Sequence, residues 1–240
     1  MHKYAVTGFD ERYWQTWGAS WLLSLKEFAK HDPEQIIIVG YDLSQNVKKK
    51  IEETGAWLLP GKFTGDFRKD TLKTIAEFAN GETGIYAYWD ADAFFQEDIS
   101  EVFDLAKDNF VYSSNRNPGF LAGPHYQWMY LRDIQNMMNF AGNDNDLYWC
   151  LLTHFDKFTA KVDDTWNFTD VPHLKDVEGL LRYNDKVQKV IHPSGPIKPF
   201  LDDRKIVFWE RYKDLYYKFT EKKKHTRSHR LVTKSRVDTK

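Results

Sequence analysis

Residues 84–104, GIYAYWDADAFFQEDISEVFD, decide the fold that this sequence predicts. The apolar run of residues 85–89 is typical of a buried strand, and it leads directly into Asp90 and Asp92. Further apolar residues follow at positions 93–95. A buried strand that ends in two carboxylates, one residue apart, indicates that the strand ends at a polar site.

The sequence before this stretch alternates between strand and helix patterns. A β-branched run without alternation, as in EQIIIVGYD, is typical of a strand covered on both faces. Tryptophans spaced three and four residues apart in WQTWGASWLLSLKEFAK predict an amphipathic helix. The pattern predicts an α/β fold with a mostly parallel, Rossmann-like sheet flanked by helices. The expected strands are residues 4–10, 34–42, 56–60 and 85–89, and the expected helices are residues 14–30, 45–53 and 70–78.

Asp90 and Asp92 follow the fourth predicted strand, and in such sheets ligands bind beyond the carboxyl ends of the strands. Two carboxylates in one turn offer hard oxygen ligands, which favour Mg²⁺ or Mn²⁺ shared with substrate phosphates. By itself, the D-x-D pattern favours a helix cap or a solvated turn, because it occurs by chance in many proteins; its place after a strand of an α/β pattern makes the metal site as strong a candidate.

A second polar segment, VIHPSGPIKPF, spans residues 190–200. Its His192 follows an apolar run, and its turn residues expose backbone amides before Lys198. An imidazole can bind a metal ion, and a lysine ammonium can meet a diphosphate as a point charge. A surface turn is the alternative for this segment taken alone.

The composition narrows the function classes. The 240 residues carry a net charge of -1, which gives no general attraction to nucleic acid. The single cysteine, Cys150, excludes an internal disulfide and a cysteine-based zinc cluster. No signal peptide and no run of 18 apolar residues is present, so we expect a cytoplasmic location.

Together, YWDADAFFQEDISEVF and HPSGPIKPF resemble two segments of glycosyltransferase family 8, which includes glycogenin and bacterial lipopolysaccharide galactosyl- and glucosyltransferases. The first resembles the metal-binding segment of that family. The second resembles its H-x-x-G-x-x-K-P-W segment, with Phe200 in place of tryptophan. The resemblance covers roughly residues 4–200 and implies one GT-A type domain over residues 1–201.

The resemblance implies a metal site and a diphosphate site. Asp90, Asp92 and His192 would bind Mn²⁺ or Mg²⁺. Gly195 and Lys198 would hold the diphosphate of a UDP-sugar donor.

Further donor contacts are implied nearer the N-terminus. Thr7 and Gly8 would approach the nucleotide base. Arg68 best matches the basic residue that contacts the donor, and Lys69, Lys73 or a merely solvated helix face remain alternatives.

Two segments of the second half complete the implied site. Asn117 and Gly119, in RNPGFLAG, would lie near the donor sugar. In NDNDLYW, Asp144 and Asn145 stand where the family has an Asp-Gln pair beside the reacting sugar. Asp146 is the alternative acid, and a helix cap is the alternative role for either aspartate.

The resemblance implies a metal-dependent, retaining glycosyltransferase that moves a hexose, glucose or galactose, from a UDP-sugar to a glycan or lipid-linked saccharide. A nucleotidyltransferase and a non-catalytic nucleotide- or carbohydrate-binding module are the alternatives. Trp166, Phe168 and His173 are candidates for the acceptor site, since aromatic faces suit sugar rings, although burial in the core is the commoner role of such residues.

Residues 202–240 form a separate segment in the sequence. They predict a basic, aromatic helix and a mobile basic tail. This composition fits peripheral binding to an anionic membrane on its cytosolic face, and a solvated tail is the alternative. We do not expect nucleic-acid binding, because the segment has no recognition motif.

Overall fold

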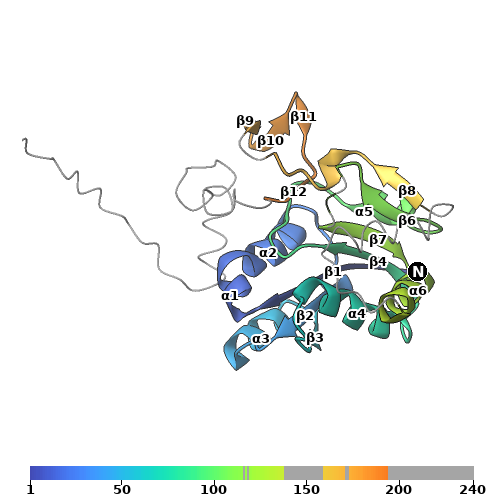
Figure 1. Ribbon diagram of the computed structural model, residues 1–240. Helices are drawn as coiled ribbons and strands as arrows, with labels where there is room; N and C mark the ends of the chain where they lie inside the picture. Colours follow the sequence, from blue (N-terminus) through green and yellow to red (C-terminus); the bar gives the residue numbers. More distant parts are fainter. Residues whose placement is uncertain (116, 118, 138–158, 171–172, 194–240) are drawn as a thin grey trace, which may run out of the picture.

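The computed structural model describes residues 1–115, 117, 119–137, 159–170 and 173–193 (Figure 1). A seven-stranded sheet runs through its centre in the order β3-β2-β1-β4-β7-β6-β8. Helices cover both faces of this sheet, which confirms the predicted α/β fold.

The sheet divides into a parallel part and a mixed part. The neighbours β3–β2, β2–β1 and β1–β4 are parallel, as the alternating sequence pattern predicts. Beyond β4, strand β7 runs antiparallel to both β4 and β6, and β8 is parallel to β6. The strands are β1 His2–Asp10, β2 Ile36–Tyr41, β3 Trp57–Pro60, β4 Gly84–Trp89, β6 Phe110–Ser113, β7 Phe120–Pro124 and β8 Thr159–Val162.

The two faces of the sheet bury separate apolar clusters. On one face, Leu72 and Ile75 of α4 and Trp128 of α6 belong to the cluster that includes Val6 of β1 and Tyr86 of β4. The other face packs against α2, α3 and α5. The helices are α1 Glu11–Tyr13, α2 Ala19–Glu27, α3 Gln45–Glu52, α4 Phe67–Ala79, α5 Ser100–Leu105 and α6 His125–Met137.

Two helices differ from their predicted bounds. Helix α4 begins at Phe67, three residues before the predicted start, because the Asp66 side chain accepts from the backbone N–H of Lys69 as an N-cap. The predicted helix over residues 14–30 is interrupted by a π-helical turn, Trp14–Gly18, before α2.

Short strands outside the seven-stranded sheet hold the C-terminal part against the rest of the fold. Strand β12, Val190–Ile191, pairs antiparallel with β5, Phe94–Phe95. Strands β9 Lys175–Val177, β10 Leu180–Tyr183 and β11 Lys186–Val187 form a separate three-stranded sheet. The buried Gln96 amide ties this sheet to the core by bonding the backbone of Leu181 and Gln188.

The predicted division at residue 201, with its C-terminal helix and tail, lies outside the described residues. Within the described part of the chain, every helix is too short or too polar to cross a lipid bilayer.

Gly8 of β1 permits the close approach of α4. A Cβ at this position would lie 2.8 Å from Thr71 Cγ2. Overpacking of this kind costs about 1–3 kcal/mol, so Gly8→Ala is expected to lower the free energy of unfolding by that amount. Denaturant unfolding measures the change.

Gly81→Ala is the control, because a Cβ there meets its nearest atom at 3.7 Å. The Gly8→Ala penalty should shrink in a Thr71→Ala background, which removes Oγ1 and Cγ2, the two nearest opposing atoms. An unchanged penalty in that background would show that the contact with Thr71 does not limit the position.

Candidate functional site

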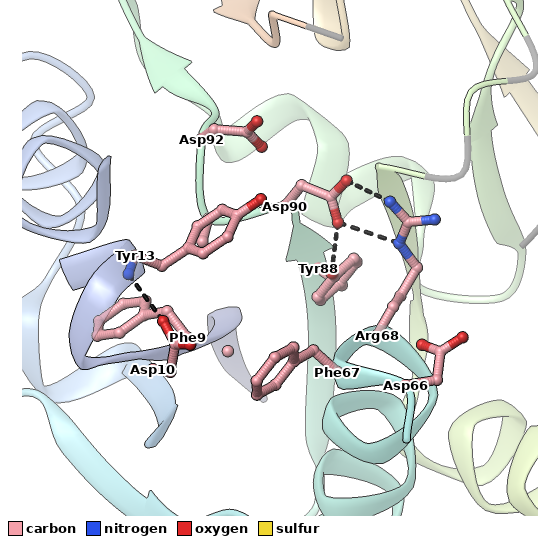
Figure 2. A pocket seen from close by; sticks show the side chains of 11 residues that line it. Phe9, Asp10, Tyr13, Asp66, Phe67, Arg68, Tyr88, Asp90 and Asp92 are labelled. Atoms are coloured by element: carbon pink, nitrogen blue, oxygen red, sulfur yellow. Dashed lines mark hydrogen bonds and ion pairs between the residues drawn. The ribbon is translucent and has the colours of Figure 1, made fainter. Parts of the chain in front are cut away.

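A cleft of about 250 Å³ opens at the carboxyl ends of β1 and β4 (Figure 2). Its walls come from β1 and the turn after it, from the first turn of α4, and from the turn after β4. The lining residues are Gly8, Phe9, Asp10, Tyr13, Asp66, Phe67, Arg68, Tyr88, Asp90, Ala91 and Asp92. The cleft therefore lies where the parallel part of the sheet predicts a ligand.

Asp90 and Asp92 lie in the tight turn after β4. The Asp90 N–H donates to the carbonyl of Gly119 at 2.9 Å, and the Ala93 N–H donates to the Asp90 carbonyl at 3.0 Å. Asp92 is only 1% exposed and Asp90 9%. Backbone hydrogen bonds thus hold the turn, so that both carboxylates enter the cleft from a rigid segment.

His192 reaches these acids through the pairing of β12 with β5. Ile191, the last residue of β12, lies opposite Phe94, so the residue that follows it comes beside the turn that carries Asp92. His192 Nε2 lies 3.3 Å from an oxygen of each aspartate, and the three ligand atoms are within 4.8 Å of one another. Two carboxylates and an imidazole at this spacing fit a divalent metal ion such as Mn²⁺.

Arg68 and Tyr88 both contact Asp90 (Figure 2). Arg68 Nε donates to Asp90 Oδ1 at 3.1 Å and Arg68 Nη2 to Oδ2 at 2.5 Å. The Tyr88 hydroxyl also donates to Oδ1, at 2.5 Å. Asp90 is therefore held in one orientation by a bidentate ion pair and a phenol.

Charge compensation keeps the buried acid ionised. Burial opposes ionisation of Asp90, but Arg68 and His192 hold its pKa well below the usual value. Burial and the neighbouring Asp90 charge raise the pKa of Tyr88 well above its usual value, so this phenol stays a hydrogen-bond donor.

The imidazole of His192 carries the second compensating charge. Burial favours its neutral form, but Asp92 and Asp90 raise the pKa of His192 to about 9. At neutral pH, two carboxylates thus face one guanidinium and one imidazolium. A bound metal ion would take the place of the Nε2 proton, because an imidazole binds a metal through a nitrogen without a proton.

Only some of the residues expected to bind the donor line the cleft. Gly8 lines the cleft, whereas the Thr7 side chain is fully buried beside it. Arg68 also lines it, but Lys69 and Lys73 do not, and Lys73 is exposed. Their roles in donor binding stay predictions.

Several cleft residues escaped the sequence analysis. Phe9 and Asp10 are the last residues of β1 and Tyr13 is the last residue of α1, which Asp10 caps by accepting from the Tyr13 N–H at 2.7 Å. Phe67 precedes Arg68 in α4. Aromatic residues next to the predicted strand end were a usable signal for this wall of the cleft.

Asn117 and Gly119 lie behind His192 and are absent from the lining of the cleft. The other predicted site residues fall outside the described part of the chain: Gly195 and Lys198 for the diphosphate, and Asp144, Asn145 and Asp146 for catalysis.

The acceptor candidates separate into buried and exposed residues. Trp166 is 3% and Phe168 5% exposed, so both belong to the core, which was the alternative role for them. His173 is exposed and lines a second pocket of about 450 Å³ beside β9 and β10, together with Asp170, Lys175, Arg182 and Tyr183.

His192→Ala removes one of three candidate metal ligands. We expect the Mn²⁺ affinity of EDTA-washed protein to fall by about 100-fold or more, beyond the usual loss from mutating an outer-shell partner. Titration followed by Mn²⁺ electron paramagnetic resonance measures the affinity. The control is His173→Ala, because His173 also pairs with an aspartate, Asp170, but outside the cleft. Equal affinities for the two variants would contradict the metal site.

Arg68→Met removes the cation that occupies both oxygens of Asp90. We expect Mn²⁺ affinity without nucleotide to rise by about tenfold, because a positive charge close to a divalent cation in a solvated cleft repels it on that scale. Arg132→Met is the control, since Arg132 pairs with Asp133 on α6. A loss of affinity in Arg68→Met would mean that the guanidinium mainly orders Asp90 for the metal.

Comparisons with known proteins add evidence on the fold. No protein-family model matches the sequence, and no curated protein matches it either. Similar solved structures include the glycosyltransferase GlyE of Streptococcus pneumoniae TIGR4, at 18% identity and a TM-score of 0.62. That match covers 91% of this chain and 63% of GlyE, so the chain spans less than two thirds of the GlyE structure.

Two further glycosyltransferases share the fold. The galactosyltransferase LgtC, solved with donor and acceptor sugar analogues, is 14% identical with a TM-score of 0.61, and the match covers 89% of this chain and 95% of LgtC. The bifunctional glycosyltransferase WbbM is 14% identical with a TM-score of 0.58, over 90% of this chain and 51% of WbbM. The chain therefore has the GT-A type fold of these glycosyltransferases, as the resemblance implied.

Proposed function

We propose that this protein is a metal-dependent glycosyltransferase that transfers a hexose, glucose or galactose, from a UDP-sugar to a glycan or lipid-linked saccharide. The convergence of Asp90, Asp92 and His192, next to the cleft that the two aspartates line, carries the proposal. Those side chains come from segments about 100 positions apart, in a fold shared with three glycosyltransferases. That shared fold favours this function over a nucleotidyltransferase.

The cleft suits a nucleotide next to the metal site. The Tyr13 ring on one wall and the exposed Phe67 ring on another border its open part (Figure 2), while Phe9 packs in the core behind them. Flat aromatic surfaces of this kind suit a nucleotide base. The diphosphate would then lie toward Arg68 and the two aspartates, where positive charge and a metal ion meet it.

Arg68 would change partners when the donor binds. Its guanidinium pairs bidentately with Asp90, and the same planar group can pair with phosphate oxygens. Lys198, which lies outside the described residues, is the further cation proposed for the diphosphate.

The proposed reaction retains the anomeric configuration. The bond between the anomeric carbon and the diphosphate oxygen breaks, and its electron pair stays on the diphosphate. An acceptor hydroxyl bonds the same face of that carbon and passes its proton to the departing diphosphate. A bound divalent metal would supply positive charge that stabilises the negative charge of the departing diphosphate. Electrostatic stabilisation of that kind is usually the largest catalytic contribution. Asp144, Asn145 or Asp146 would lie beside the anomeric carbon.

The second pocket is our candidate for the acceptor. Its Tyr183 ring packs at 5.1 Å on Phe168, whose carbonyl accepts from the His192 N–H at 2.8 Å. The pocket is thus connected through one residue to the strand that carries His192. Tyr183, His173 and Arg182 offer the ring face and hydrogen-bonding groups that a saccharide needs.

Manganese, UDP and a peripheral position on an anionic membrane complete the proposal. The membrane contact would come from residues 202–240, and it rests on their basic, aromatic composition alone.

Asp92→Asn should slow transfer strongly while leaving the fold intact. Wild-type protein is expected to release UDP from UDP-glucose or UDP-galactose with Mn²⁺ and to lose this activity in EDTA. We expect the variant to lose about 10²–10³-fold in kcat, the scale of removing one preorganised electrostatic contact. A coupled assay for released UDP, over a panel of sugar donors, measures the change.

Asp104→Asn is the matched control, because Asp104 is exposed and pairs with Lys3 and Lys107. UDP that raises the melting temperature only with Mn²⁺, but no turnover with any donor, would instead favour the non-catalytic binding module. If the protein shows no UDP binding and no turnover, the proposed function is contradicted.

A further inference from the structure

A buried hydrogen bond holds His192 from the side opposite the two aspartates. His192 Nδ1 lies 2.9 Å from Asn167 Oδ1, and Nε2 of the same ring lies 3.3 Å from Asp90 and Asp92. Asn167 is 0% exposed and His192 2%. Both side chains are therefore shielded from solvent, and losing this hydrogen bond would leave Nδ1 without a solvent partner.

The surroundings decide which way the Asn167 amide points. Its Nδ2 donates to the backbone carbonyl of Asn117 at 3.1 Å, and a carbonyl only accepts. The amide oxygen is then left to face the ring, so Nδ1 of His192 carries a hydrogen that it donates to Asn167. With Nδ1 occupied in this way, Nε2 is the nitrogen available to a metal ion.

The segment around Asn117 is shaped to hold this arrangement. Asn117 Oδ1 accepts from the Gly119 N–H at 2.8 Å, and the Asn115 side chain donates to the Asn167 carbonyl at 2.5 Å. A Cβ at position 119 would lie 2.5 Å from His192 Nδ1, so only glycine leaves room for the ring.

We propose that Asn167 is a positioning residue that fixes the tautomer and the direction of His192, so that Nε2 faces the metal. Asn117 and Gly119 would act through this contact rather than by touching the donor sugar. The inference rests on the proposed metal site. It gives the two residues a role that agrees with their place beside the His192 ring and the Asn167 amide.

Asn167→Leu keeps the approximate size of the side chain and removes the acceptor. We expect its Mn²⁺ affinity without nucleotide to fall by about 10- to 100-fold, the usual result of removing the partner of a metal-binding histidine. Gln188→Leu is the matched control, because Gln188 is a buried amide whose side chain bonds the Lys186 carbonyl instead. Its Mn²⁺ affinity should stay at the wild-type value.

Two further variants separate positioning from general support of the fold. Asn167→Asp keeps an oxygen that accepts from Nδ1, but its second oxygen cannot donate to the Asn117 carbonyl, so the variant should bind Mn²⁺ more tightly than Asn167→Leu without reaching the wild-type affinity. Asn167→Ser is too short to reach the ring and should match the leucine variant, which keeps the test open if that variant fails to fold. In a His192→Ala background, Asn167→Leu should cause no further loss, because the residue through which it acts is gone.

The outcomes distinguish this inference from the function on which it rests. If wild-type protein binds no Mn²⁺, the metal site itself is wrong and the inference falls with it. If wild-type protein binds Mn²⁺ and Asn167→Leu binds it equally well, only the role of Asn167 is overturned. The same holds if Asn167→Leu lowers the Mn²⁺ affinity as much in the His192→Ala background as in the wild-type background.

Discussion

The antiparallel pairing of β12 with β5 is the constraint on which the site depends. Each strand has only two residues, but β5 begins two positions after Asp92 and β12 ends one position before His192. The pairing therefore brings an imidazole against a pair of carboxylates. A shift of register by one residue would turn His192 to the other face, because side chains alternate along a strand.

Several buried polar contacts keep this short pairing in place. Gln96 satisfies three backbone groups of the C-terminal segment, and Phe168 exchanges backbone hydrogen bonds with Val190 and His192 on the other edge of β12. Buried polar groups that lose such partners are costly, so these contacts specify one arrangement. The result is a rigid floor beneath a cleft whose walls come from β1 and α4.

The electrostatics of the cleft match its geometry. Two acids are buried together, and such a pair is tolerated only with opposite charge close by. Arg68 supplies one positive charge and the protonated His192 the other. Both cations lie where a divalent metal and a diphosphate would bind, so the side chains of the cleft hold the charge pattern of the proposed complex.

The sequence alone determined the parallel part of the sheet and the place of the two acids at its carboxyl edge. Those features follow from local periodicity: the run over residues 34–42 and the apolar strand before Asp90 are readable in one segment each. The resemblance added His192 as a third metal ligand.

Only the tertiary structure decided which side chains meet. The pairing of β5 with β12 joins residues far apart in the chain, and two-residue strands leave no periodic signal. The contacts of Asn167 with His192, of Arg68 with Asp90 and of Gly119 with the imidazole are likewise non-local. Such contacts depend on packing between elements, which one sequence does not encode in any pattern of neighbouring residues.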